Sequence, residues 1–123
     1  MRILAADHDQ DNLKVLSLKL ESNGFDVVVA HDGEEALSQI RKQKPDLIIL
    51  DVMMPKISGF QIARLVKFDE NLKKIPLILL SARAQETDKT VGKEVGADLY
   101  ITKPYDPEHL LKEVQRLLGT DVS

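Results

Sequence analysis

The feature that most limits the fold is a continuous apolar run, Leu47-Ile48-Ile49-Leu50, which ends on Asp51. An apolar run without polar alternation is typical of a strand that is buried on both faces, as in a parallel sheet. Asp51 would then lie at the carboxyl end of a central strand, where open α/β sheets form their binding crevice. A carboxylate at that place can be a nucleophile or a metal ligand, and the structural alternative is a cap on the next loop or helix.

Five apolar runs alternate with five segments in which apolar residues recur at helical spacing. The runs cover residues 2–6, 25–30, 47–50, 77–80 and 99–101, and the helical segments begin near residues 10, 33, 59, 87 and 107. Strict alternation predicts an α/β fold, a doubly wound (βα)5 arrangement with a five-stranded parallel sheet and helices on both of its faces. We expect one domain over residues 1–119 and a frayed tail over residues 120–123.

The helical segments differ in the width of the face that their patterns predict to be buried. The first carries Leu13, Leu16 and Leu20 together with Val15 and Leu18, which predicts a broad buried stripe. The third offers as core residues Phe60, Ile62, Ala63, Leu65 and Val66. The fourth, over about residues 87–95, has few large apolar residues and an internal glycine, which costs about 1 kcal/mol relative to alanine. We therefore expect the fourth helix to be a movable element.

Composition and charge exclude several classes of function. The 123 residues include no cysteine, which excludes disulfides and thiolate metal sites and suits a reducing cytosol. No apolar run is long enough to span a bilayer and no signal-peptide pattern opens the chain, so we expect a cytoplasmic protein without membrane contact. The net charge of −3 offers no basic surface for nucleic acid. No GxGxxG or Walker A sequence follows a predicted strand, so a nucleotide-binding site has little support.

Polar side chains follow four of the five predicted strands, at one edge of the predicted sheet. Asp7 follows the first strand, Asp51 ends the third, Ser81 ends the fourth and Lys103 follows the fifth. Carboxylates can hold a divalent cation, and the cation, a hydroxyl and an ammonium group can together neutralise phosphoryl oxygens. The set therefore favours phosphoryl transfer with Asp51 as the nucleophile that forms an acyl phosphate. Taken alone, each residue could instead be a cap or a solvated surface group.

These residues resemble a known family, the receiver domains of bacterial two-component response regulators, which include chemotaxis response regulators. The resemblance covers almost the whole chain and implies a flavodoxin-like fold with strand order 2-1-3-4-5. The matching segments are Asp7-His8-Asp9, Leu50-Asp51-Val52-Met53-Met54-Pro55 with Ser58-Gly59, Leu80-Ser81-Ala82, and Lys103-Pro104 after Gly96-Ala97.

The resemblance implies a role for each residue of the phosphoryl site. Asp51 would be the phosphoacceptor, served by a sensor histidine kinase or a phosphotransfer protein. Ser81 and Lys103 would each bind a phosphoryl oxygen, and the Lys103–Pro104 peptide bond would be cis. Tyr100 matches an aromatic switch position that turns inward when Ser81 moves, and the structural alternative is a strand aromatic on a half-exposed face.

The metal position departs from the family pattern. The resemblance implies Mg²⁺ held by Asp7 through water, by Asp51 and by the main-chain carbonyl of Met53. The family usually has a second acidic residue directly after the first, and His8 stands there instead. Either Asp9 or water substitutes for it, or Mg²⁺ binding is weakened by loss of a Coulomb attraction of up to about 4 kcal/mol. Because imidazole suits softer ions, the second possibility would favour Mn²⁺ or Zn²⁺.

Two other functions fit parts of the pattern. A degenerate receiver would act as a phosphorylation-independent interaction module, although the complete phosphoryl-transfer set argues against that. A haloacid-dehalogenase-type phosphohydrolase would use Asp7 as nucleophile and Asp9 as acid, but Asp11 stands where that motif has threonine or valine.

A receiver is self-phosphorylating and self-dephosphorylating rather than a metabolic enzyme, and its output is a changed surface. Phosphorylation would change the face formed by the fourth helix, the fifth strand and the fifth helix. That face would act on an effector domain, on a downstream protein or on a second copy of the chain in a homodimer.

Overall fold

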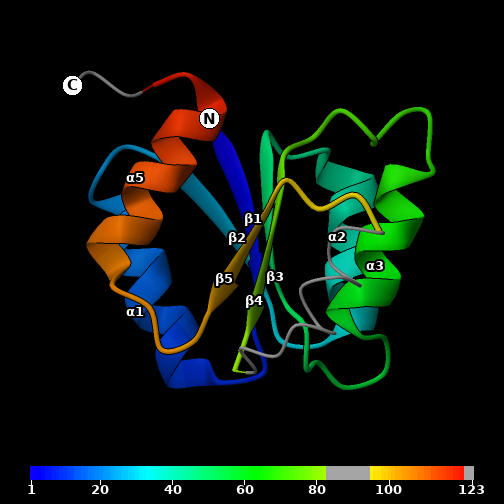
Figure 1. Cartoon of the computed structure of the whole chain (residues 1–123), viewed down its shortest axis with the longest axis horizontal. Helices are drawn as coiled ribbons and strands as arrows, with labels where there is room; N and C mark the ends of the chain where they lie inside the picture. The colour runs from blue at the N-terminus through cyan, green and yellow to red at the C-terminus, as the bar shows by residue number, and fades with distance from the viewer. Residues whose placement is uncertain (83–94, 121–123) are drawn as a thin grey trace.

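One sheet of five parallel strands runs through the centre of the computed structural model, which describes residues 1–82 and 95–120 (Figure 1). Its spatial order is β2-β1-β3-β4-β5, as the resemblance implies. The strands are β1 (Arg2–Ala6), β2 (Asp26–Ala30), β3 (Leu47–Asp51), β4 (Leu77–Ser81) and β5 (Leu99–Thr102). Each strand end falls within one residue of its predicted position, so the strand prediction is confirmed.

The described helices cover both faces of the sheet, as Figure 1 shows. α1 (Gln10–Glu21) and α5 (Pro107–Leu118) pack on one face, and α2 (Gly33–Gln43) and α3 (Gly59–Lys67) pack on the other. The helix expected over about residues 87–95 lies outside the described residues except for Val95, which is buried in the core on the α2–α3 side. None of the described helices has the length and apolar character that a membrane span needs.

The two central strands bring the functional candidates to one level. β3 and β4 are buried along their whole length because helices cover both of their faces. In the parallel register Ala6 lies beside Leu50, and Asp51 lies beside Leu80. Ser81, the next residue of β4, lies beside Thr102 of β5. The residues that end or follow β1, β3, β4 and β5 therefore meet at the carboxyl edge of the sheet.

The burial expected for three apolar helix residues is wrong. The exposed fractions of Val15 and Leu18 in α1 are 54% and 59%, and that of Leu65 in α3 is 45%. At 3.6 residues per turn, positions 15 and 18 lie on the side of α1 that points away from the sheet. The α1 residues that are buried are Leu13, Leu16, Ser17 and Leu20. The buried stripe of α1 is thus narrow, and the Ser17 hydroxyl within it donates to the Leu13 carbonyl oxygen at 2.8 Å.

A side-chain cap fixes the start of each described helix. The capping residues are Asp9, Asp32, Ser58 and Asp106. Ser58 and Gln61 form a complete capping box, and at the start of α2 the Glu35 N–H donates to the Asp32 carboxylate. The cap at Asp9 bears on the site, because it ends the short loop that follows β1.

The last helix ends at Gly119, whose φ of +71° suits a residue without Cβ. The next residue is still attached, since the Thr120 N–H donates to the Gln115 carbonyl oxygen at 2.8 Å. The rest of the expected tail, residues 121–123, lies outside the described residues.

Candidate functional site

Two buried carboxylates and one ammonium group meet at the carboxyl edge of the sheet. The exposed fraction is 0% for Asp7 and 1% for Asp51. The Lys103 Nζ lies 2.7 Å from Asp7 Oδ2 and 3.4 Å from Asp51 Oδ2. The ammonium group offsets the repulsion between two negative charges that burial would otherwise make costly. The peptide bond that follows, Lys103–Pro104, is cis.

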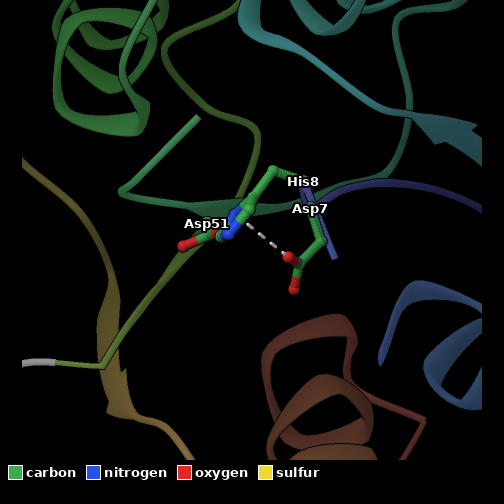
Figure 2. A group of neighbouring side chains, drawn as sticks. All are labelled: Asp7, His8 and Asp51. Atoms are coloured by element: carbon green, nitrogen blue, oxygen red, sulfur yellow. Dashed lines mark hydrogen bonds and ion pairs between the residues drawn. The ribbon is translucent and has the colours of Figure 1, made fainter. Parts of the chain in front are cut away.

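His8 lies directly against both carboxylates. Its Nδ1 is 2.5 Å from Asp51 Oδ2 and 3.6 Å from Asp7 Oδ1, and half of its side chain is exposed. Figure 2 shows the three side chains gathered at the ends of their strands. Because an ionised carboxylate can only accept a hydrogen bond, the contact with Asp51 requires the proton to be on Nδ1. His8 is therefore part of the site, which the sequence pattern alone does not establish.

The Asp7 carboxylate is held in its ionised form. Burial alone would raise the pKa of Asp7, but hydrogen bonds from Lys103, the Asp9 N–H and Asn12 hold that pKa below its ordinary value. The Asp9 N–H lies 2.9 Å from Asp7 Oδ1, and Asn12 Nδ2 lies 2.7 Å from Asp7 Oδ2. The side chain of Asp9 itself accepts from the first N–H groups of α1. Of the two candidates next to Asp7, the structure thus brings His8, rather than the Asp9 carboxylate, to the site.

The donor set can be tested against a metal ion. One ligand atom each from Asp7, His8 and Asp51 lies within 4.8 Å of the other two, the one such group among the described residues. The two carboxylates fit Mg²⁺, which prefers oxygen ligands. The imidazole nitrogen is a donor that suits Zn²⁺, Mn²⁺ or related ions better. The residues present therefore form a candidate metal cluster that fits a divalent cation but departs from an all-oxygen Mg²⁺ site.

The loop after β3 is tied to Asp51 through the backbone. The Met53 N–H donates to Asp51 Oδ1 at 3.1 Å, and the Gly59 N–H donates to the Val52 carbonyl oxygen at 3.0 Å. A Cβ atom at Gly59 would lie 2.4 Å from the Asp51 carbonyl oxygen, so a larger residue would push the start of α3 away. The glycine in the Ser58-Gly59 pair is required by this close approach.

Ser81 and Tyr100 occupy the β4–β5 side of the site. Ser81 is buried at the end of β4, and its carbonyl oxygen accepts from the Lys103 N–H at 2.7 Å. Tyr100 in β5 is half-buried and packs against the core on the α2–α3 side. Its ring is thus partly sheltered rather than fully turned to solvent.

Two supporting residues were missed by the sequence analysis. Asn12 lies one helical turn after the loop that carries Asp7, and Tyr105 follows the cis peptide. Burial raises the pKa of Tyr105 to about 12, and the negative charges of Asp7 and Asp51 add to that rise, although Asn12 opposes it. Tyr105 lines an open hollow of about 290 Å³ beside Lys103. The available signal for Tyr105 was its position just after β5, and for Asn12 it was a polar side chain in the first turn of the helix that follows Asp7.

Comparisons with known proteins agree with this geometry. The chain matches the response regulator receiver domain family over residues 3–115. It is 39% identical over 117 residues to PhoP, the alkaline phosphatase synthesis transcriptional regulatory protein of Bacillus subtilis, a match that covers 95% of this chain and 48% of PhoP. The chain therefore belongs to the receiver domains of two-component response regulators, and it spans about half the length of PhoP.

Solved structures give the same result. The chemotaxis response regulator CheY4 of Vibrio cholerae superposes with a TM-score of 0.89 and 37% identity, over 95% of this chain and 98% of that one. The receiver domain of a sensor histidine kinase from Pseudomonas aeruginosa PAO1 has a TM-score of 0.87 and 29% identity, over 96% and 97% of the two chains. That structure holds a magnesium ion in its active-site cleft. A receiver domain is a signal-transduction module rather than a metabolic enzyme, as expected.

Proposed function

We propose that Asp51 accepts a phosphoryl group from a sensor histidine kinase or a phosphotransfer protein. An Asp51 carboxylate oxygen bonds to phosphorus while the P–N bond of the donor phosphohistidine breaks, and the leaving imidazole takes up a proton. The observation that carries this proposal is Lys103, whose ammonium group lies within 3.4 Å of two buried carboxylates. It is placed to pair with a phosphoryl oxygen, and the Ser81 hydroxyl would bind another.

His8 has to leave Asp51 before the phosphoryl group enters. Its Nδ1 lies 2.5 Å from Asp51 Oδ2. The incoming phosphoryl group or the divalent cation would need the space that the imidazole occupies there. Because half of the imidazole side chain is already exposed, it can turn outward without opening the core. His8 would thus compete with the incoming group for Asp51.

A divalent cation would be held by Asp7, Asp51 and the main-chain carbonyl of Met53, with His8 at the neighbouring position. When bound, such an ion neutralises the negative charge on the phosphoryl oxygens. We propose that Mg²⁺ serves, as the P. aeruginosa receiver suggests, but binds about 10- to 1000-fold more weakly than with a carboxylate at position 8. Mn²⁺ would then compete well, because imidazole is a better ligand for it than for Mg²⁺.

The output would run through Ser81 and Tyr100 to the face that includes β5 and α5. The fourth helix, also part of the expected face, lies outside the described residues. The partner of that face would be an effector domain, a downstream protein or a second copy of the chain; PhoP is a transcriptional regulator twice as long as this chain. We place the chain in the cytoplasm, because that is where a histidine kinase obtains ATP. The absence of cysteine also suits a reducing compartment.

Intact-mass spectrometry after incubation with acetyl phosphate tests the proposal. We expect one phosphoryl group on the wild type, none on Asp51→Asn, and an unchanged level on the control Asp26→Asn, which alters an exposed aspartate in β2. Label that persists in Asp51→Asn but disappears in Asp7→Asn would instead identify the phosphohydrolase. A wild type that takes up no phosphoryl group with either Mg²⁺ or Mn²⁺ would identify a degenerate receiver.

A further inference from the structure

The α2–α3 side of the molecule carries a groove that the phosphoryl site does not use. Two open hollows adjoin at the loop that joins β3 to α3: one of about 550 Å³ is lined by that loop and α3, and one of about 450 Å³ is lined by α2 and Ile57 of the loop. Because Ile57 lines both, the two hollows are neighbours, and together they are called here the α2–α3 groove. Figure 1 shows the two helices on the same side of the sheet, away from α1 and α5.

The groove has an apolar strip on its α3 side. Ile57 and Phe60 are only half-buried, and Leu65 is 45% exposed. Phe68, three residues after Leu65 at the end of α3, is 77% exposed and extends the strip beyond the groove. Large apolar side chains that are exposed together, rather than singly, are typical of an interaction surface.

The rim of the groove is basic although the chain as a whole is acidic. Arg41, Lys42, Lys56 and Arg64 line it against a single acidic residue, Glu34, whereas the net charge of the chain is −3. Lys56 lies 3.5 Å from Asp32 and 3.7 Å from Glu34. The two arginines and Lys42 form no ion pair with any described residue. Their place in the last turns of α2 and α3 suits the helix dipoles, but the dipoles do not account for the apolar strip between them.

We propose that the α2–α3 groove binds a helix of a partner protein in which a row of apolar residues is flanked by aspartate and glutamate. The apolar row would cover Ile57, Phe60 and Leu65, and the acidic residues would pair with Arg41 and Arg64. Every lining residue belongs to a helix or to the β3–α3 loop, so the groove presents side chains and no strand edge for an extended peptide to join. An amphipathic helix laid in a groove is the binding mode that such walls fit.

The groove is one loop away from Asp51. Lys56 and Ile57 belong to the segment that leaves Asp51 and ends at Gly59, whose N–H and Cα pack on the backbone of residues 51 and 52. The same loop is fixed to α2, because the Gly33 N–H donates to the Pro55 carbonyl oxygen at 3.1 Å. The proposed partner would thus contact the loop that carries the phosphoryl site without entering that site.

A displayed library of random peptides of about 16 residues, roughly four helical turns, selected on the unphosphorylated protein tests the proposal. The strongest peptides are synthesised with a fluorophore, and their Kd is measured by polarisation. We expect acidic sequences with apolar residues at helical spacing, whose Kd rises about tenfold or more with Arg64→Glu or Leu65→Glu. The matched controls are Lys14→Glu and Leu18→Glu, which place the same changes on exposed positions of α1 on the opposite side of the sheet.

Three outcomes would overturn the proposal. The first is that no peptide is recovered, or that the recovered peptides lack the acidic and apolar pattern. The second is that the α1 controls weaken binding as much as the groove variants do. The third is that peptides fail to bind and the groove has another occupant. That occupant would be a second copy of the chain, seen in sedimentation velocity, or phosphatidylserine vesicles, with Arg64→Glu abolishing the interaction. Because the protein stays unphosphorylated, failure here leaves the role of Asp51 unaffected.

Discussion

Lys103 lies at the carboxyl ends of the strands and Lys67 at their amino ends. Their side chains are buried to a similar degree, with exposed fractions of 16% and 13%, but their partners differ. Lys67 Nζ, at the amino edge, donates to the carbonyl oxygens of Ile75 and Lys73 at 2.8 and 3.2 Å, and to Asp98 Oδ2 at 2.9 Å. One ammonium group there meets one carboxylate and two neutral oxygens, so charge and hydrogen bonds are both satisfied.

At the carboxyl edge one ammonium group is shared by two buried carboxylates. The carboxylates of Asp7 and Asp51 face the single ammonium group of Lys103, which leaves an excess of negative charge that a cation can neutralise. Asp98 at the other edge is partly open to water and also accepts from the Leu77 N–H at 2.8 Å. The same residue type, buried to a similar degree, therefore balances one carboxylate at one place and is outnumbered by two carboxylates at the other.

The largest effect should separate the two lysines by activity. Lys103→Met removes the cation that would stabilise the phosphoryl oxygens, and we expect the rate of phosphorylation by acetyl phosphate to fall about 100- to 1000-fold. Lys67→Met is the matched control and should leave that rate unchanged. Time-resolved intact-mass spectra measure both rates, with circular dichroism to verify that each variant is folded. Equal losses of rate in the two variants would mean that Lys103 has no more influence on phosphorylation than Lys67.

Stability tests the structural role of Lys67. Lys67→Met leaves two carbonyl oxygens and the Asp98 carboxylate without their donor, and we expect the free energy of unfolding to fall by about 1–3 kcal/mol. The exposure of Asp98 keeps the loss below that of a fully buried pair. Urea denaturation gives the value, and Lys73→Met, which removes an exposed pair with Glu70, is the control. A loss as small as that of the control would mean that Lys67 contributes no more than a surface lysine.

The excess of negative charge around Asp7 and Asp51 can be increased by one carboxylate. His8→Asp adds a third carboxylate next to Asp7 and Asp51, and we expect the Kd for Mg²⁺ to fall about 10- to 1000-fold, with a smaller gain for Mn²⁺. His31→Asp adds the same charge at an exposed position at the end of β2 and should change neither constant. Calorimetric titration of each ion measures them. An unchanged Mg²⁺ affinity in His8→Asp would show that the imidazole is no handicap.

The smallest expected effect is on the free energy of unfolding at acidic pH. The pKa of Asp7 is lower in the folded protein than its ordinary 3.8, in spite of burial, because Lys103, Asn12 and the Asp9 N–H bind the ionised form. Ionised Asp7 thus adds stability that is complete above pH 3.8 and is lost as the pH falls through the folded-state value. We expect the free energy of unfolding of Asp7→Asn to depend less on pH below 3.8 than that of the wild type. The control Asp26→Asn should retain the pH dependence that Asp7 causes. Parallel curves for wild type and Asp7→Asn would contradict the assignment.

Sequence was sufficient for the strands and for the edge where the site forms. Short unbroken apolar runs such as residues 47–50 are typical of a buried strand, and the turn and capping residues that bound each run favour a strand over a helix. With parallel strands, this places Asp7, Asp51, Ser81 and Lys103 at one edge without any knowledge of their contacts.

The rest depends on side-chain directions that no local pattern specifies. The rotation of α1 decides that Val15 and Leu18 are exposed, whereas the sequence pattern predicted one broad buried stripe that included both. The direction of His8 toward Asp51, and the tie between Lys67 and Asp98, both join residues more than 30 positions apart in the chain. Such contacts are set by how the packed elements meet, which a single sequence does not encode locally.

The ion pair between Asp7 and Lys103 joins residues 96 positions apart, close to the full length of the domain. During synthesis the N-terminal strand emerges from the ribosome first, and the fifth strand must follow before the pair can form. A truncated or half-made chain holds Asp51 but lacks the lysine that completes its surroundings. Because the pair needs both ends of the chain, this part of the site is complete only when nearly the whole domain has folded.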